Sequence, residues 1–188
     1  MPEKEMSKFK ERNLFSRLKK KDKDAFAVAY DLYVADINRF IFFKIGNKDE
    51  ANDLTSVVFL KTWDYVKTNN LVDSRTLKAL LYKIARTSIV DYYRSRQVVA
   101  SIDDEEHKID VIDDAQDVVS QIALNSDLEM IRAKLPELKI EYREILIMRF
   151  VNDLSLDEIA DITGKNKVNI RVLTFRALKA LRELIEEK

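Results

Sequence analysis

The chain has 188 residues, of which 46% are hydrophobic and 35% are charged, and it contains two glycines, two prolines and no cysteine. The lack of cysteine excludes disulfides and thiolate metal sites, and no apolar run approaches the roughly 18 residues that a membrane-spanning helix needs. Few helix breakers and many Leu, Ile, Lys, Glu and Ala residues predict an all-α protein, which we expect in the cytoplasm and not inserted in a membrane.

The zero net charge of the chain conceals three segments of different character. Residues 1–97 contain 20 Lys and Arg against 13 Asp and Glu, residues 98–127 contain 1 against 9, and residues 128–188 contain 12 against 11. Clustered carboxylates repel one another and disfavour compaction. We therefore expect two small helical domains joined by an acidic flexible linker at 98–127. The lone His107 lies in this linker without neighbours at metal-ligand spacing, and we expect neither a metal nor a cofactor.

The first domain is expected to contain a short helix around residues 14–18 and two longer ones. One begins after Asp22 or Asp24 and ends at Gly46, where a left-handed residue is needed. The next covers residues 49–66 and has the acidic first turn that the helix dipole favours. The aromatic residues expected in the core are Phe26, Phe40, Phe59 and Trp63.

We expect a helix that contains residues 80–96, LLYKIARTSIVDYYRSR. It is expected to follow a loop at 67–70 and to be capped by Asp73 or Ser74. At 100° per residue with Leu81 facing inward, the opposite face carries cations and a tyrosine, and Tyr82 lies on the flank. Such a face suits a partner with phosphates and stackable bases, and a merely solvated surface is the alternative. Leu77, Ile84, Ala85, Ser88 and Tyr92 are expected on the inner face. The candidate DNA-contacting residues are Tyr82, Lys83, Arg86, Thr87, Tyr93 and Arg94.

After the linker, Pro136 is expected in the first turn of a helix that runs to about Val151. Its apolar stripe is expected to comprise Leu138, Ile145, Leu146 and Phe150.

The remaining segment has the order of a helix-turn-helix, with a helical hairpin in a bundle as the alternative. Residues 155–158 (SLDE) form a capping-box pattern, residues 163–165 predict a tight turn, and a longer helix begins near Asn166 or Lys167. In a helix-turn-helix the second helix enters the major groove of DNA. Ile170, Ala177, Leu181 and Leu184 are expected to face inward. The candidate DNA-contacting residues are Lys165, Asn166, Lys167, Asn169, Arg171, Val172, Phe175 and Arg176.

Residues 25–63, 80–96 and 135–184 together resemble bacterial RNA polymerase sigma factors of the extracytoplasmic-function (ECF) group. The resemblance implies that the N-terminal domain docks on core RNA polymerase and opens the downstream promoter element with the 80–96 helix. It also implies that the helix-turn-helix reads the upstream element of promoter DNA, while the linker threads through the polymerase. An anti-sigma factor is common in this family and is a possible further partner. The polymerase-binding residues that the resemblance implies are Asp53, Leu54, Ser56 and Lys61, and Phe59 also matches the motif.

Some positions depart from the pattern of the family. Ser56 and Val57 stand where Gln and an acidic residue are usual, and Thr87 stands where Asn is frequent. Residues 172–174 (VLT) replace a Ser-Arg-Leu-like run. The promoter sequence therefore cannot be copied from relatives.

Two other classes of protein fit parts of the sequence. One is an ordinary helix-turn-helix regulator with an N-terminal sensory or dimerisation domain. The other is a helical adaptor, or a sigma-like protein that has lost promoter function. One His, no Cys and no glycine-rich phosphate loop leave no candidate catalytic constellation, so we expect no enzymatic activity.

Overall fold

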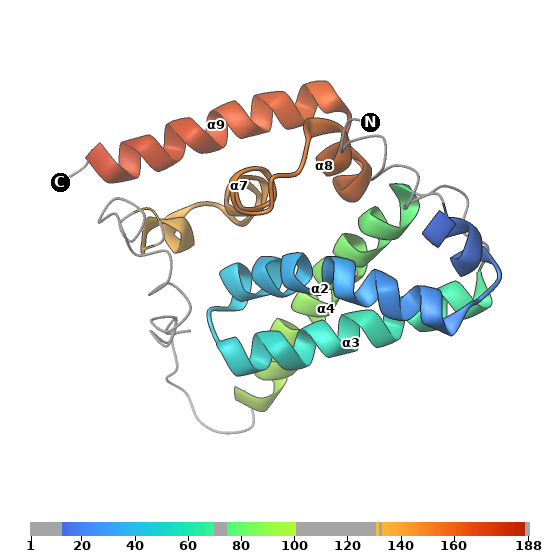
Figure 1. The fold of residues 1–188 in the computed structure, drawn as a ribbon. Coiled ribbons are helices and arrows are strands. Elements are labelled where there is room, and N and C mark those ends of the chain that lie inside the picture. The colour runs from blue at the N-terminus through green and yellow to red at the C-terminus, as the bar shows by residue number, and fades with distance from the viewer. Residues whose placement is uncertain (1–12, 70–74, 101–130, 132, 187–188) are drawn as a thin grey trace. The chain divides into compact units, whose positions relative to one another are not determined.

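The computed structural model describes residues 13–69, 75–100, 131 and 133–186, without the side chains of 75, 76 and 97–100. All regular structure in these residues is helical (Figure 1). Of the described residues, 13–41, 49–69 and 75–100 form one compact unit, and 42–48, 131 and 133–186 form a second. The all-α class with two helical domains is thus confirmed. Residues 98–100 of the expected linker belong to the end of a helix, and 101–127 lie outside the described residues.

In the first unit, a helix at residues 13–19 precedes α2 (Lys23–Ile45, in this unit as far as Ile41), α3 (Lys48–Thr68, in this unit from Asp49) and α4 (Arg75–Ala100) (Figure 1). The helix α3 therefore extends into the segment that was expected to be a loop, and the expected cap at residues 73–74 lies outside the described residues.

The predicted ends of α2 are confirmed. The Asp22 carboxylate accepts hydrogen bonds from the backbone N–H groups of Asp24 and Ala25, at 2.9 and 3.2 Å. Gly46 has a φ of 79°, and its N–H donates to the carbonyl oxygen of Phe42 at 2.8 Å. A left-handed glycine therefore ends the helix, as the sequence predicts.

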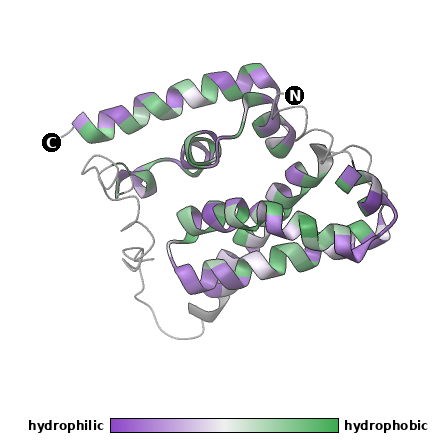
Figure 2. Ribbon diagram, in the orientation of Figure 1, coloured by the Kyte–Doolittle hydropathy of each residue, from purple (hydrophilic) through white to green (hydrophobic). Residues whose placement is uncertain are grey.

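Hydrophobic and hydrophilic residues are interleaved along the helices of both units (Figure 2). Phe40 and Phe59 are buried as expected, whereas Phe26 and Trp63 are half-buried, with ring centres 4.9 Å apart. Between α2 and α3, the Asn38 amide donates to the side-chain oxygens of Asn52 and Thr55, at 2.9 and 3.2 Å. Among the described residues, no helix has the length and apolarity that crossing a membrane requires.

Glu50 ties the C-terminal half of α4 to the start of α3. Its carboxylate accepts hydrogen bonds from the Tyr92 hydroxyl and the Arg96 guanidinium, and that guanidinium lies 5.0 Å from the centre of the Tyr92 ring. Burial, together with the hydrogen bond to Glu50, raises the pKa of the Tyr92 phenol above its ordinary value. This contact places Tyr92 on the inner side of α4, as predicted.

The second unit contains η1 (Leu135–Glu137), α7 (Ile140–Leu146), η2 (Ile147–Val151), α8 (Leu156–Thr163) and α9 (Lys167–Glu186). The expectation of one continuous helix from Pro136 to Val151 is therefore wrong. Pro136 does open a helical turn, but η1 is a three-residue 3-10 helix, and Lys139 (φ −51°, ψ 138°) interrupts the path before α7 begins.

The π-helical turn η2 changes which side chains are buried. The N–H of Asn152 donates to the carbonyl oxygen of Ile147, five residues back, at 3.0 Å. Ile147 and Met148 are 0% exposed, while Phe150 is 55% exposed. Phe150 was expected in the apolar stripe, and this expectation is wrong because the wider turn shifts the helical phase.

The core of the second unit joins the short helices to α9. Ile170, Ala177 and Leu181 are buried on the inner face of α9 as predicted, and Leu184 is half-buried. The buried cluster that α9 shares with η1 and α7 comprises Leu135, Leu138, Leu146, Ala177 and Leu181.

A pair of substitutions checks the phase of η2. We expect Met148→Ala to lower the free energy of unfolding by about 2–5 kcal/mol, because it empties a fully buried site. Phe150→Ala should change it by about 1 kcal/mol at most, because that ring is largely exposed. Urea denaturation followed by circular dichroism measures both values. An equal loss for the two variants would contradict the burial of Met148 and the exposure of Phe150.

The contact between Tyr92 and Glu50 predicts a dependence of stability on pH. A phenol whose pKa is raised by folding stays protonated when the unfolded chain ionises, so its contribution is complete below pH 10 and is lost as the pH rises further. We expect the melting temperature of the wild-type chain to fall more steeply than that of Tyr92→Phe as the pH rises above about 10. Parallel pH profiles for the two proteins would show that the contact does not form.

Candidate nucleic-acid interface

Tyr82 lies on the buried side of α4 and not on its flank. Its side chain is 0% exposed, and its ring centre lies 5.2 Å from that of Phe40 in an edge-to-face arrangement. The neighbouring Leu81 and Ala85 are buried as well. The expectation that Tyr82 offers an accessible ring to DNA is therefore wrong, because a ring on α2 covers it.

The outward face of α4 carries the other candidate residues. Lys83, Thr87 and Arg94 are exposed, whereas Arg86 and Tyr93 are half-buried. In the described part of the chain, neither Lys83 nor Arg94 pairs with a carboxylate. These two side chains therefore leave positive charge available on this face for an anionic partner.

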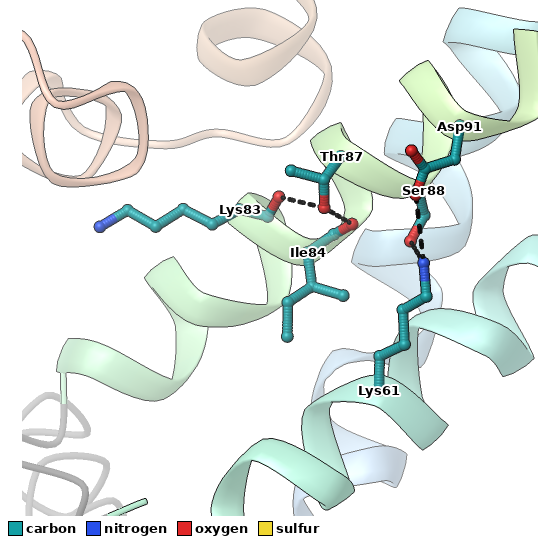
Figure 3. A network of polar contacts seen from close by, with 6 residues as sticks. All are labelled: Lys61, Lys83, Ile84, Thr87, Ser88 and Asp91. Atoms are coloured by element: carbon teal, nitrogen blue, oxygen red, sulfur yellow. Dashed lines mark hydrogen bonds and ion pairs between the residues drawn. The ribbon is translucent and has the colours of Figure 1, made fainter. Parts of the chain in front are cut away.

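Thr87 uses its hydroxyl group within α4. The hydroxyl donates to the carbonyl oxygens of Ile84 and Lys83, at 2.9 and 3.4 Å, while the Lys83 side chain extends away from the helix (Figure 3). A hydroxyl has a single proton to donate. The proton of Thr87 is therefore used within α4 and is not offered to a base.

Lys61 bridges α3 and α4. Its ammonium lies 3.2 Å from the Ser88 hydroxyl oxygen and 3.4 Å from the Asp91 carboxylate (Figure 3). Half-exposed ion pairs of this kind contribute about 0.2–1 kcal/mol. Lys61 was a candidate for polymerase binding. In the structure, its side chain joins two helices of the first unit.

The outward face of α3 presents apolar side chains beside polar ones. Asp53 and Ser56 are exposed there, and Leu54 is half-buried. Val57 and Leu60 are 39% and 65% exposed. Neither was expected at the surface, although at 100° per residue they share a face with Asp53. Phe59 is buried, with its ring centre 4.7 Å from that of Tyr30.

The helix-turn-helix in the second unit has the predicted local structure. The N–H of Ser155 donates to the Glu158 carboxylate at 2.7 Å, and the N–H of Glu158 donates to the Ser155 hydroxyl at 3.2 Å, which completes the capping box. Gly164, with a φ of 71°, ends α8. The Asn166 side chain accepts a hydrogen bond from the N–H of Asn169 at 2.8 Å and so caps α9.

The candidate residues of α9 and the turn are all exposed, but their charges are not equally available. Lys165 pairs with Glu141 at 2.9 Å, and Lys167 pairs with Asp157 at 2.7 Å. Val172 and Phe175 project from the part of α9 opposite its buried face, and Asn169, Arg171 and Arg176 lie on the exposed flanks. Val168, which the sequence reading missed, is exposed on the same side.

Two family models match most of the described helices. The sigma-70 region 2 model matches residues 29–98, and the sigma-70 region 4 model matches residues 128–181. The first match contains α3 and nearly all of α4, and the second contains the helix-turn-helix.

Curated relatives share much of the length of the chain. RNA polymerase sigma factor SigV of Bacillus subtilis is 31% identical over 147 residues, which cover 78% of this chain and 82% of SigV. ECF RNA polymerase sigma factor BldN of Streptomyces coelicolor is 29% identical over 180 residues, or 93% of this chain. The match covers 65% of BldN, so the chain spans less than two thirds of that relative.

Solved structures share the fold at lower sequence identity. CnrH in complex with the cytosolic domain of CnrY has a TM-score of 0.68 at 17% identity, over 94% of this chain and 97% of that one. The sigma factor RpoE in complex with the anti-sigma factor NepR from Bartonella quintana has a TM-score of 0.64 at 21% identity, over 87% and 98%. These likenesses show the fold. The family models and the identity to SigV show that the chain is an RNA polymerase sigma factor, and with ECF relatives such as BldN they show that it belongs to the ECF group.

Proposed function

We propose that three helices of this sigma factor make the contacts that transcription initiation requires. The outward face of α3 binds core RNA polymerase, the outward face of α4 holds the downstream promoter element as its strands part, and α9 reads the upstream element. In this proposal residues 1–97 and 128–188 are the two working domains, and residues 98–127 are the linker between them.

The observation that carries this proposal is the presence of exposed cations without a carboxylate partner on two helices in different units. Among the residues that the structure describes, these are Lys83 and Arg94 on α4 and Arg171 and Arg176 on α9. Cations that no internal carboxylate neutralises attract the phosphates of DNA. Two such surfaces in one chain suit a protein that contacts two promoter elements.

The energetics favour a factor that depends on the polymerase. Opening five base-pair steps costs about 7 kcal/mol at about 1.4 kcal/mol per step. Stacking two or three bases on aromatic rings returns about 2–9 kcal/mol. Because Tyr82 is buried, α4 offers fewer accessible rings than the sequence suggested. The chain alone should therefore melt DNA poorly, and we propose that it acts without bond-making chemistry of its own.

An ordinary helix-turn-helix regulator is not favoured, because the sigma-70 region 2 model matches residues 29–98, outside the helix-turn-helix. The solved structure of RpoE contains the anti-sigma factor NepR, and that of CnrH contains the cytosolic domain of CnrY. An anti-sigma factor is accordingly a further partner in this proposal. Because the chain is proposed to bind core RNA polymerase, we place it in the cytoplasm together with the polymerase.

Polymerase binding is tested on the outward face of α3. We expect Leu60→Asp to weaken binding to core RNA polymerase about tenfold or more, because the new carboxylate must be desolvated in the interface. Leu60 is 65% exposed, so the fold should remain intact. The matched control is Leu32→Asp on α2, where the side chain is 51% exposed. Fluorescence titration with core polymerase gives both affinities, and equal effects would remove α3 as the docking helix.

Strand separation is tested on α4. We expect the double variant Lys83→Gln and Arg94→Gln to open less promoter DNA than the wild-type holoenzyme and to keep its affinity for core polymerase. The salt slope of DNA binding should fall by about 1.4, at about 0.7 per lost contact to a single-strand phosphate. A fluorescent base analogue in the downstream element reports opening, with Lys67→Gln on α3 as the control. Unchanged opening, or an equal loss of polymerase binding, would show that this face does not hold the DNA.

A further inference from the structure

Apolar side chains occupy the centre of the outward face of α9. Val168 and Phe175 are 68% and 70% exposed, and Val172 between them is 42% exposed. They follow one another at spacings of four and three residues, so they form one stripe about 10 Å long on one side of the helix. Ile170 and Ala177, on the opposite side, are both 0% exposed. The stripe therefore has no part in the core of the second unit.

Positive charge without an internal partner flanks this stripe. Within residues 133–186, no carboxylate pairs with Arg171 or Arg176. Lys167, Lys179 and Arg182, nearer the ends of α9, pair with carboxylates at 2.7, 3.7 and 2.6 Å. The available charge of the helix is thus concentrated beside the apolar stripe. An anionic partner with an apolar surface is complementary to this arrangement.

The major groove of DNA offers such a surface. Each thymine presents its 5-methyl group there, between two rows of phosphates, and no other base carries an apolar group in that groove. Valine and phenylalanine side chains have no hydrogen-bonding groups, so they distinguish bases by contact with a methyl group and not by donors and acceptors.

On the basis of the proposed reading of the upstream element by α9, we infer that Val168, Val172 and Phe175 select thymines through their 5-methyl groups. Arg171 and Arg176 bind the flanking phosphates and hold the helix in the groove. Specificity at the thymine positions then comes from the apolar stripe, and the arginines supply affinity.

The test removes methyl groups from the DNA without changing base pairing. Duplexes are first selected, by the complex of the chain with core polymerase, from a pool with a randomised upstream element. Each selected thymine is then replaced by deoxyuridine, which lacks only the 5-methyl group. We expect the dissociation constant to rise about fourfold per contacted methyl, which corresponds to about 0.8 kcal/mol.

Variants of the protein identify the side chains that contact the methyl groups. Val172→Ala and Phe175→Ala should reduce the ratio of the affinities for thymine and deoxyuridine DNA toward one. Leu178→Ala is the matched control, because Leu178 is also 42% exposed on α9 but lies about 120° around the helix from Val172. The control should keep the wild-type ratio of the affinities for thymine and deoxyuridine DNA. All three side chains are exposed enough that the fold should survive.

The outcomes separate this inference from the proposed function. If deoxyuridine has no effect while Arg171→Gln and Arg176→Gln still weaken binding, α9 binds DNA but does not read methyl groups, and the inference fails alone. If the valine and phenylalanine variants weaken binding equally on both DNAs, the stripe contacts something other than thymine methyls, and the inference also fails. If neither the DNA changes nor the arginine variants affect binding, the assignment of α9 to the upstream element fails as well.

Discussion

The side chains that a helix buries fix its rotation about its own axis, and this constraint decides which residues of the protein can meet DNA. On α4, the burial of Leu81 and Tyr82 directs Lys83 outward. On α9, the burial of Ile170 leaves Val172 on the outer face. Because each residue turns the helix by about 100°, a shift of one position would replace the outward set almost completely. The functional surfaces therefore depend on core packing more than on any contact at the surface.

Pairing between charged side chains then decides where positive charge remains. In the first unit, Glu50 binds Arg96 and Asp91 binds Lys61, so both cations are used between α3 and α4. Pairs as exposed as that of Lys61 add little to stability, and packing holds the helices together. These pairs neutralise Lys61 and Arg96, whereas Lys83 has no carboxylate partner in the described part of the chain. The same division on α9 leaves Arg171 and Arg176 without a carboxylate partner within residues 133–186.

Local signals in the sequence predicted the helix ends. The expectations for Tyr82 and Phe150 were wrong because they depended on features that these local signals do not report. Gly46, Gly164 and the capping box at residues 155–158 each act within a few residues, so their geometry could be predicted. Tyr82 is buried by Phe40, 42 residues earlier in the sequence, which no helical period reveals. The π-helical turn η2 exposes Phe150 through a hydrogen-bond pattern that has no compositional sign. Apolar residues at surfaces, such as Leu60 and Val168, have the same hydrophobicity as core residues, so their residue type does not show that they are exposed.

Reconstituted transcription tests most directly whether these surfaces serve initiation. Core RNA polymerase is assayed with and without the chain, on promoter fragments that their complex selects from a random pool. We expect run-off transcripts from one start position only when the chain is present, together with a stable complex between the chain and core polymerase. Failure of the chain to bind core polymerase, or transcripts of equal yield without it, would contradict its assignment as the initiation factor.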